Sequence, residues 1–128
     1  VIASGVLEHC IHDYESLKEL WRILTPDGYL FISYLPNWLS VKEWQRRNIN
    51  KKDYHLRLYG ISQIRQMLLR AGFVTVEVGY HTFFWESLVE KIGVKGYPNR
   101  FANLLKKVFP LQIFSSTLCV IAQKKYVM

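Results

Sequence analysis

The sequence predicts an α/β fold, in which helices pack on a sheet that contains parallel strands. Two apolar runs, residues 1–5 and 29–35, lie on either side of a segment with helical periodicity. Short apolar runs are typical of strands buried in a parallel sheet, and two such strands joined by a helix form a right-handed crossover. A second helix followed by a strand is expected at residues 62–80. These patterns indicate strands and helices that alternate around one sheet.

The segment between the two apolar runs carries the signals of one helix and one turn. Asp13 belongs to the residue types that cap helix N-termini. An apolar stripe at helical spacing follows it, formed by Leu17, Leu20, Trp21 and Leu24. Such a stripe packs a helix against a sheet. Pro26 and Gly28 then occupy the second and fourth positions of a segment that suits a type I turn.

The later elements follow from similar patterns. Ser62 is expected to cap a helix, and Gly72 stands where a left-handed residue ends one. The residues that share the apolar face of this helix are Ile64, Met67, Leu68 and Ala71. Residues 73–80 alternate valines with other residues, which predicts a strand. Residues 85–108 show two amphipathic helical stripes, which could pack on the domain or lie on a membrane surface.

Composition places the chain among ordered globular domains. Of its 128 residues, 50% are hydrophobic and 15% are aromatic, which is rich enough for a core and within the size of one domain. No apolar run approaches the roughly 18 residues of a membrane-spanning helix. Cys10 and Cys119 are too few for a disulfide framework, and Cys119 is expected to be a buried free thiol. We therefore expect a reducing, cytoplasmic environment.

Four short motifs occur in a fixed order along the chain. They are Leu7-Glu8-His9, Pro26-Asp27-Gly28, Leu35-Pro36-Asn37 and Ala71-Gly72-Phe73. In this order they resemble the second half of class I S-adenosylmethionine-dependent methyltransferases. Within that family they are similar to the quinone and lipid methyltransferases. The resemblance covers residues 1–79 well and extends to residues 117–124.

The resemblance implies a particular part of a Rossmann-like three-layer sandwich. Residues 1–128 would form the C-terminal half of the domain, with its fourth to seventh strands and an antiparallel last strand at residues 117–124. Residues 81–116 would be an amphipathic insertion between the last two strands. The family's glycine-rich cofactor turn is missing, because the seven glycines of the chain never form a Gly-x-Gly pair. We therefore expect that the N-terminal cofactor-binding half is absent and that the isolated chain is inactive.

The implied activity is methyl transfer from S-adenosylmethionine to a small-molecule or lipid-like acceptor, directed at oxygen. His9 would act as the general base for a hydroxyl acceptor, with Glu8 orienting it, although His9 could instead only order the turn. Ser4 and Gly5 lie where family members touch the cofactor. No metal site is expected, because Gly5 replaces the acid that quinone methyltransferases carry three residues before the Glu-His pair.

Three further residues are candidates for binding the substrate. Tyr34 and Asn37 lie at the end of the second strand, and His55 lies in a stretch that borders the cleft in the family. For His55 the alternative is an ordinary surface histidine.

The net charge of +7 is unevenly distributed. Residues 42–70 carry eight basic and two acidic side chains, whereas residues 1–41 carry two basic and five acidic ones. The basic residues ahead of the second helix are Lys42, Arg46, Arg47, Lys51, Lys52 and Arg57. They predict an anionic substrate or a peripheral contact with an anionic membrane, or else form a solvated surface. The alternative function is therefore a non-catalytic scaffold that binds an anionic partner, whereas nucleic acid is not expected.

Overall fold

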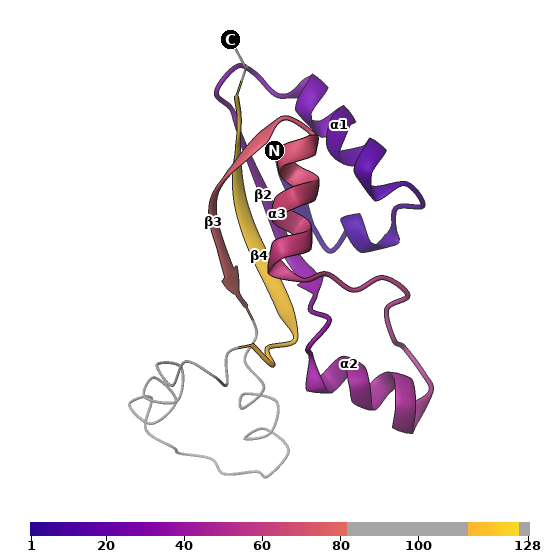
Figure 1. Ribbon diagram of the computed structural model, residues 1–128. Helices are drawn as coiled ribbons and strands as arrows, with labels where there is room; N and C mark the ends of the chain where they lie inside the picture. The colour runs from indigo at the N-terminus through magenta and orange to yellow at the C-terminus, as the bar shows by residue number, and fades with distance from the viewer. Residues whose placement is uncertain (82–112, 126–128) are drawn as a thin grey trace.

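Figure 1 shows a computed structural model of the chain, which describes residues 1–81 and 113–125. The strands are β1 (Ile2–Ser4), β2 (Tyr29–Pro36), β3 (Phe73–Tyr80) and β4 (Thr117–Lys124). They form one sheet in the order β1-β2-β4-β3, in which β1 is parallel to β2 and β4 is antiparallel to β2 and β3. The parallel crossover and the antiparallel last strand are thus confirmed, and so is the α/β class.

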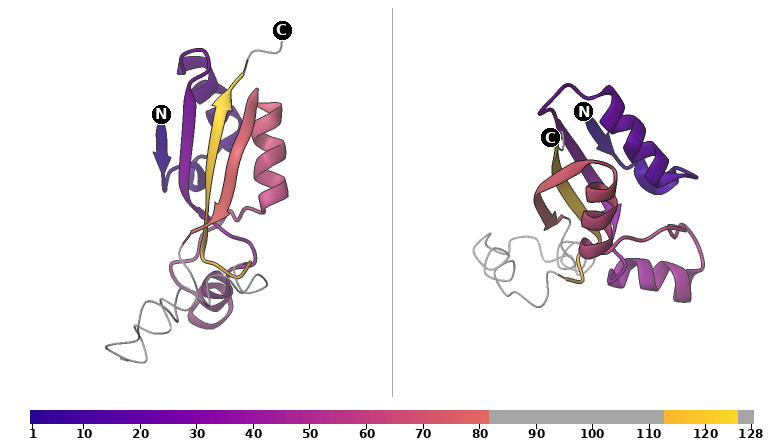
Figure 2. Two further views of the ribbon diagram at one scale, coloured as in Figure 1. Left: turned by 90° about the vertical axis from the view of Figure 1, so that its left-hand side faces the viewer. Right: turned by 45° about the horizontal axis from the view of Figure 1, so that its top comes forward.

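The helices are α1 (Asp13–Ile23), α2 (Val41–Gln45) and α3 (Ile61–Arg70), with a 3-10 helix η1 (Leu7–His9) and a π-helical turn η2 (Arg46–Asn50). Both α1 and α3 lie on the same side of the sheet (Figures 1 and 2). Their buried leucines and isoleucines join the inward residues of β2 and β4 in one core. Within the described residues, every helix is too short or too polar to cross a bilayer.

Only one face of the sheet is covered within the described part of the chain. Along β2, Leu30 and Ile32 are buried, whereas Tyr29 and Phe31 are 47% and 44% exposed. Ile2 in β1 is 76% exposed. The prediction that both strands are buried on both faces was therefore wrong, because α1 and α3 pack on the same side and no described helix covers the other. The described residues form two of the three expected layers.

Strand β3 runs between the predicted residues, but its burial differs from the prediction. Its pairing with β4 shifts between Thr75 and Glu77. A bulge of this kind moves the following residues to the other face of the strand. Phe73 is consequently buried before the bulge and Val78 packs on the core after it, whereas Val74 is 41% exposed.

Three local predictions need correction. The Thr25–Gly28 turn is closed by a 3.0 Å hydrogen bond from the Gly28 N–H to the Thr25 carbonyl, but Asp27 has a φ of 57°, which a type I turn does not allow. Helix α1 begins at Asp13 and has His12 at its N-cap, so Asp13 lies one position inside the predicted cap; its Oδ1 accepts a 2.9 Å hydrogen bond from the Tyr14 N–H, and its Oδ2 accepts one from the Tyr59 hydroxyl. Helix α3 has Gly60 at its N-cap, one position before its first residue Ile61, and Ser62 lies inside the helix.

The segment from Trp38 to Asn50, which carries three of the basic residues named above, is largely helical. The Ser40 hydroxyl accepts a 3.1 Å hydrogen bond from the Glu43 N–H and caps α2, which continues into η2. Cys119 is partly buried and Cys10 is likewise half-buried, both as free thiols. The expected insertion at residues 81–116, with its two amphipathic helices, lies outside the described residues except at its ends.

Candidate functional site

The candidate site lies at the carboxyl end of β1, the edge at which parallel α/β sheets bind ligands. There the Ser33 hydroxyl donates a 2.9 Å hydrogen bond to the Ser4 hydroxyl. The Gly5 N–H donates to the Ser33 carbonyl at 3.1 Å, and Gly5 adopts a left-handed φ of +60° that a side chain would disfavour. This turn leads the chain directly into η1 and presents Glu8 and His9 beside Ser4 and Gly5.

Glu8 and His9 differ sharply in exposure. The Glu8 side chain is only 3% exposed, whereas that of His9 is 69% exposed. The Glu8 Oε1 atom lies 3.8 Å from His9 Nε2, and Glu8 Oε2 accepts no hydrogen bond from the described residues. A desolvated carboxylate oxygen is costly without a partner. The pair therefore combines a buried acceptor with an imidazole that an incoming molecule can reach.

His55 reaches the same place from the segment between η2 and α3. Its ring centroid lies 6.1 Å from that of His9. Its Nδ1 atom lies 2.8 Å from Glu43 Oε1, and its backbone N–H donates to Glu43 Oε2 at 3.1 Å. The structure therefore brings together Glu8, His9 and His55, which the sequence analysis had proposed from separate stretches of the chain.

Glu43 is the residue of this site that the sequence analysis missed. Its side chain is 4% exposed and also accepts a 3.0 Å hydrogen bond from Arg46. Burial acts to raise the pKa of Glu43, but the hydrogen bonds from His55 and Arg46 together outweigh it and hold the pKa below its usual value. The available signal was the Ser-x-x-Glu pattern of Ser40 and Glu43, which is typical of a capped helix N-terminus.

A second polar cluster fixes the segment that carries His55. Arg57 donates to the Cys10 and Ile11 carbonyls at 2.8 and 3.0 Å and lies 3.1 Å from an Asp13 carboxylate oxygen. The buried Tyr59 hydroxyl donates to the same carboxylate at 3.0 Å. Burial and the neighbouring Asp13 raise the pKa of the Tyr59 phenol. The segment before α3 is thereby tied to the turn between η1 and α1, which directly follows His9.

The other two substrate candidates lie apart from these histidines. Tyr34 is 50% exposed, has a left-handed φ of 59° and packs edge-on against His81 with centroids 5.1 Å apart. Asn37 is 2% exposed, and its amide nitrogen donates to the carbonyls of Ile113 and Ser115 at 2.7 and 2.8 Å. The amide nitrogen of Asn37 is therefore used inside the fold, and we do not propose Asn37 as a substrate contact.

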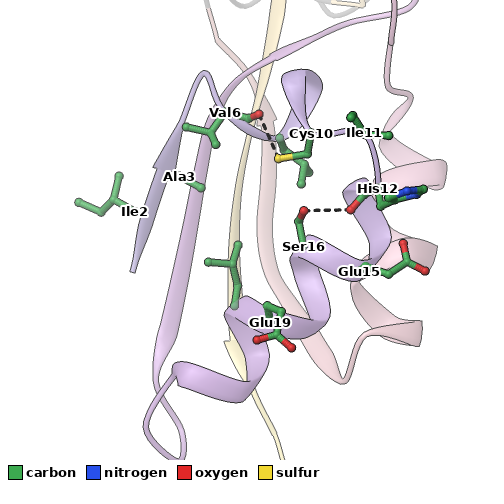
Figure 3. A pocket seen from close by; sticks show the side chains of 11 residues that line it. Ile2, Ala3, Val6, Cys10, Ile11, His12, Glu15, Ser16 and Glu19 are labelled. Carbon is green, nitrogen blue, oxygen red and sulfur yellow. Dashed lines mark hydrogen bonds between the residues drawn. The ribbon is translucent and has the colours of Figure 1, made fainter.

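A separate apolar hollow of about 650 Å³ lies between β1, η1 and α1 (Figure 3). Ile2, Val6 and Ile11 line it and are 76%, 50% and 82% exposed. None of Glu8, His9 and His55 lines this hollow. This hollow is therefore an apolar surface beside the candidate site and not part of it.

No family model and no curated protein matches the sequence, but solved structures share its fold. They include a methyltransferase from Thermotoga maritima, described as a possible histamine N-methyltransferase, with a TM-score of 0.67 and 18% identity over 97% of this chain. A methyltransferase from Archaeoglobus fulgidus has a TM-score of 0.62, also with 18% identity over 97% of the chain. Phosphoethanolamine N-methyltransferase 2 from Haemonchus contortus, solved with S-adenosylmethionine, has a TM-score of 0.60 with 17% identity over 98% of the chain.

These matches cover only part of the larger proteins. The chain spans 54%, 58% and 33% of the three matched structures, respectively. At these identities the likeness establishes the fold and not the chemistry. The chain thus has the Rossmann-like α/β fold of S-adenosylmethionine-dependent methyltransferases, over part of a domain.

Proposed function

We propose that this chain is part of an enzyme that transfers a methyl group from S-adenosylmethionine to a small-molecule or lipid-like acceptor. The observation that carries the proposal is the position of Ser4, Gly5, Glu8 and His9. They lie at the carboxyl end of β1, in a fold that the chain shares with S-adenosylmethionine-dependent methyltransferases. That edge is the general ligand site of open α/β sheets.

The proposed roles follow from exposure and chemistry. Methyl transfer needs an acceptor lone pair in line with the sulfonium methyl, so much of the catalysis is positioning. Ser4 and Gly5 would contact the cofactor, and His55 would contact the acceptor. His9, which is exposed, would take the proton of a hydroxyl acceptor, while the buried Glu8 would orient it. This assignment makes the reaction directed at oxygen.

The cofactor would also need a second half of the domain, which we place against β1. In the sheet, β1 pairs only with β2, so its other edge is free within the described residues. Ile2 and Val6 are exposed apolar side chains near that edge, and Ile11 lines the same hollow beyond Cys10 (Figure 3). An exposed apolar surface next to an unpaired strand is typical of a covered interface. Further strands of a larger domain would satisfy both features.

The alternative function is a scaffold that binds an anionic partner. It is weakened because several of the basic side chains bind groups of the chain itself. Arg46 is paired with Glu43, and Arg57 binds two backbone carbonyls and Asp13. Arg47 donates to the His55 carbonyl at 2.7 Å and stacks on the Tyr54 ring. Half of the six basic residues therefore serve the fold of this segment, and we favour methyl transfer.

The test uses the protein at its full natural length with isotopically labelled S-adenosylmethionine and panels of hydroxyl, amine and lipid acceptors. We expect labelled product from a hydroxyl acceptor. His9→Asn should lower turnover by about 10²- to 10⁴-fold, the usual contribution of a general base. Cofactor affinity and melting temperature, measured on the same variant, should stay unchanged.

Two results would contradict the proposal at different levels. No transfer to any acceptor by a folded protein that binds the cofactor would reject the enzyme. Transfer at an unaltered rate by His9→Asn would reject only the base role of His9.

A further inference from the structure

We propose that Glu8, His9 and His55 form a binding site for a divalent transition-metal ion. One candidate ligand atom from each of the three side chains lies within 4.8 Å of the others. Binding of the ion does not depend on the proposed function. Only a catalytic use of the ion would depend on it. No metal was expected from the sequence, because Gly5 replaces the acid that would be a third ligand beside Glu8 and His9. In the structure His55, from a distant segment, lies close enough to be that third ligand.

The buried carboxylate of Glu8 is the first independent support. Its side chain is 97% removed from solvent, since only 3% is exposed, and Oε2 has no hydrogen-bond donor among the described residues. The Glu8 carboxylate is aimed at His9, with Oε1 3.8 Å from His9 Nε2. Buried charges in proteins are normally paired or coordinate metals. A cation between Glu8 and the two imidazoles would supply the missing partner.

The contact between His55 and Glu43 is the second support. Histidines that bind metals almost always use their other ring nitrogen to contact a carboxylate or a carbonyl, which fixes the tautomer. His55 Nδ1 lies 2.8 Å from Glu43 Oε1, and Arg46 holds the same oxygen at 3.0 Å. With the Nδ1 proton donated to Glu43, the remaining nitrogen of His55 carries a lone pair available to an ion.

The spacing fits a site that closes around its ion. Bonds of about 2.0–2.2 Å in a tetrahedral arrangement bring ligand atoms to about 3.4 Å from each other. The present spread of up to 4.8 Å therefore requires a modest closing movement. His9 can make this movement, because its side chain is 69% exposed.

The donor set indicates the class of ion. Two imidazoles and one carboxylate suit Zn²⁺ and its first-row neighbours, whereas Mg²⁺ and Ca²⁺ prefer oxygen ligands. Three protein ligands leave a fourth position open, as in catalytic zinc sites. If the proposed function holds, an acceptor hydroxyl would occupy that position; the ion would make its O–H more acidic, and the proton would pass to water. His9 would be a ligand while the ion is bound, and the base role proposed above applies to the metal-free protein.

The experiment measures metal binding by the full-length protein without S-adenosylmethionine. After treatment with a chelator, the protein is titrated with Zn²⁺ by calorimetry and with Co²⁺ by visible absorption. We expect one ion per chain. Affinity should fall at least tenfold in His9→Ala and His55→Ala, and by about 10- to 100-fold in Glu43→Gln, the usual effect of losing such an outer partner. His12→Ala is the matched control, since this exposed histidine lies on the same stretch outside the cluster.

Circular dichroism melting curves identify which variants remain folded, and a comparison limited to these decides the assignment. Unchanged affinity in a folded His55→Ala or Glu43→Gln protein would overturn the site, and so would the absence of binding by the folded wild type. A cobalt spectrum with thiolate character would assign the ion to a cysteine and also overturn it. A protein that binds the ion at these residues but transfers no methyl group would reject the proposed function and leave the metal site intact.

Discussion

Gly72 shows how one residue controls the junction between α3 and β3. It has a left-handed φ of +94°, and a Cβ there would lie 2.7 Å from Trp21 Nε1. The same indole N–H donates to the Gly72 carbonyl at 3.0 Å. An alanine would therefore meet backbone strain and a steric conflict together.

We expect Gly72→Ala to lower the free energy of unfolding by about 1–3 kcal/mol, the cost of holding a side chain in a disfavoured backbone region. Gly79→Ala is the matched control, because the nearest atom to its Cβ is Cys119 Sγ at 4.0 Å. Urea denaturation measures both. An equal loss of stability in the two variants would show that neither the φ angle nor the indole contact is responsible.

The candidate site could be predicted from the sequence where its residues are contiguous. Glu8 and His9 follow a recognisable strand, so their place at the sheet edge needs only the local pattern. Glu43 could not be assigned in this way, because its role depends on His55 lying twelve residues later and folding back onto it. The inward orientation of the Asn37 amide could not be predicted for a related reason, since its partners, Ile113 and Ser115, are far along the chain.

At the scale of elements, Tyr59 and Arg57 attach the segment before α3 to the start of α1. The Tyr59 side chain is fully buried, and its hydroxyl donates to the Asp13 carboxylate at 3.0 Å. This contact, with those of Arg57, places His55 beside His9.

Tyr59→Phe should destabilise the fold by about 1.5–3 kcal/mol, the range for a hydrogen bond to a charged group. Tyr54→Phe is the control, because Tyr54 is 41% exposed and its contact with Arg47 uses the ring, which phenylalanine keeps. Thermal and urea unfolding of both variants provide the comparison. If both behave like the wild type, the Tyr59 hydroxyl does not hold the two segments together.

Local periodicity predicted most of the elements. The bounds of β3 and β4 match the predicted ranges, since each strand is set off by turns or helix ends in the sequence. The bulge in β3 could not be predicted, because it depends on the pairing register with β4. The one-sided burial of β2 also escaped prediction, since an apolar run does not reveal which face a helix will cover.

At the scale of the whole molecule, the described sheet contains only part of what S-adenosylmethionine binding requires. We expect residues 1–128 alone to bind S-adenosylmethionine weakly or not at all, because this chain lacks a glycine-rich turn for the cofactor. Calorimetry on the isolated chain, beside the full-length protein as control, measures this. Micromolar binding by the isolated chain would contradict the expectation and place the whole cofactor site within the described edge of the sheet.

The position of β4 also sets the order in which the molecule can assemble. Among the described strands this one comes last in sequence, yet it lies between β2 and β3 and is the partner that joins them. During synthesis, the edges of β2 and β3 that pair with β4 would therefore stay unpaired until residues 117–124 leave the ribosome. Such late, long-range pairing slows folding and leaves strand edges open to aggregation. A premature stop ahead of β4 would accordingly leave β2 and β3 without the strand that joins them.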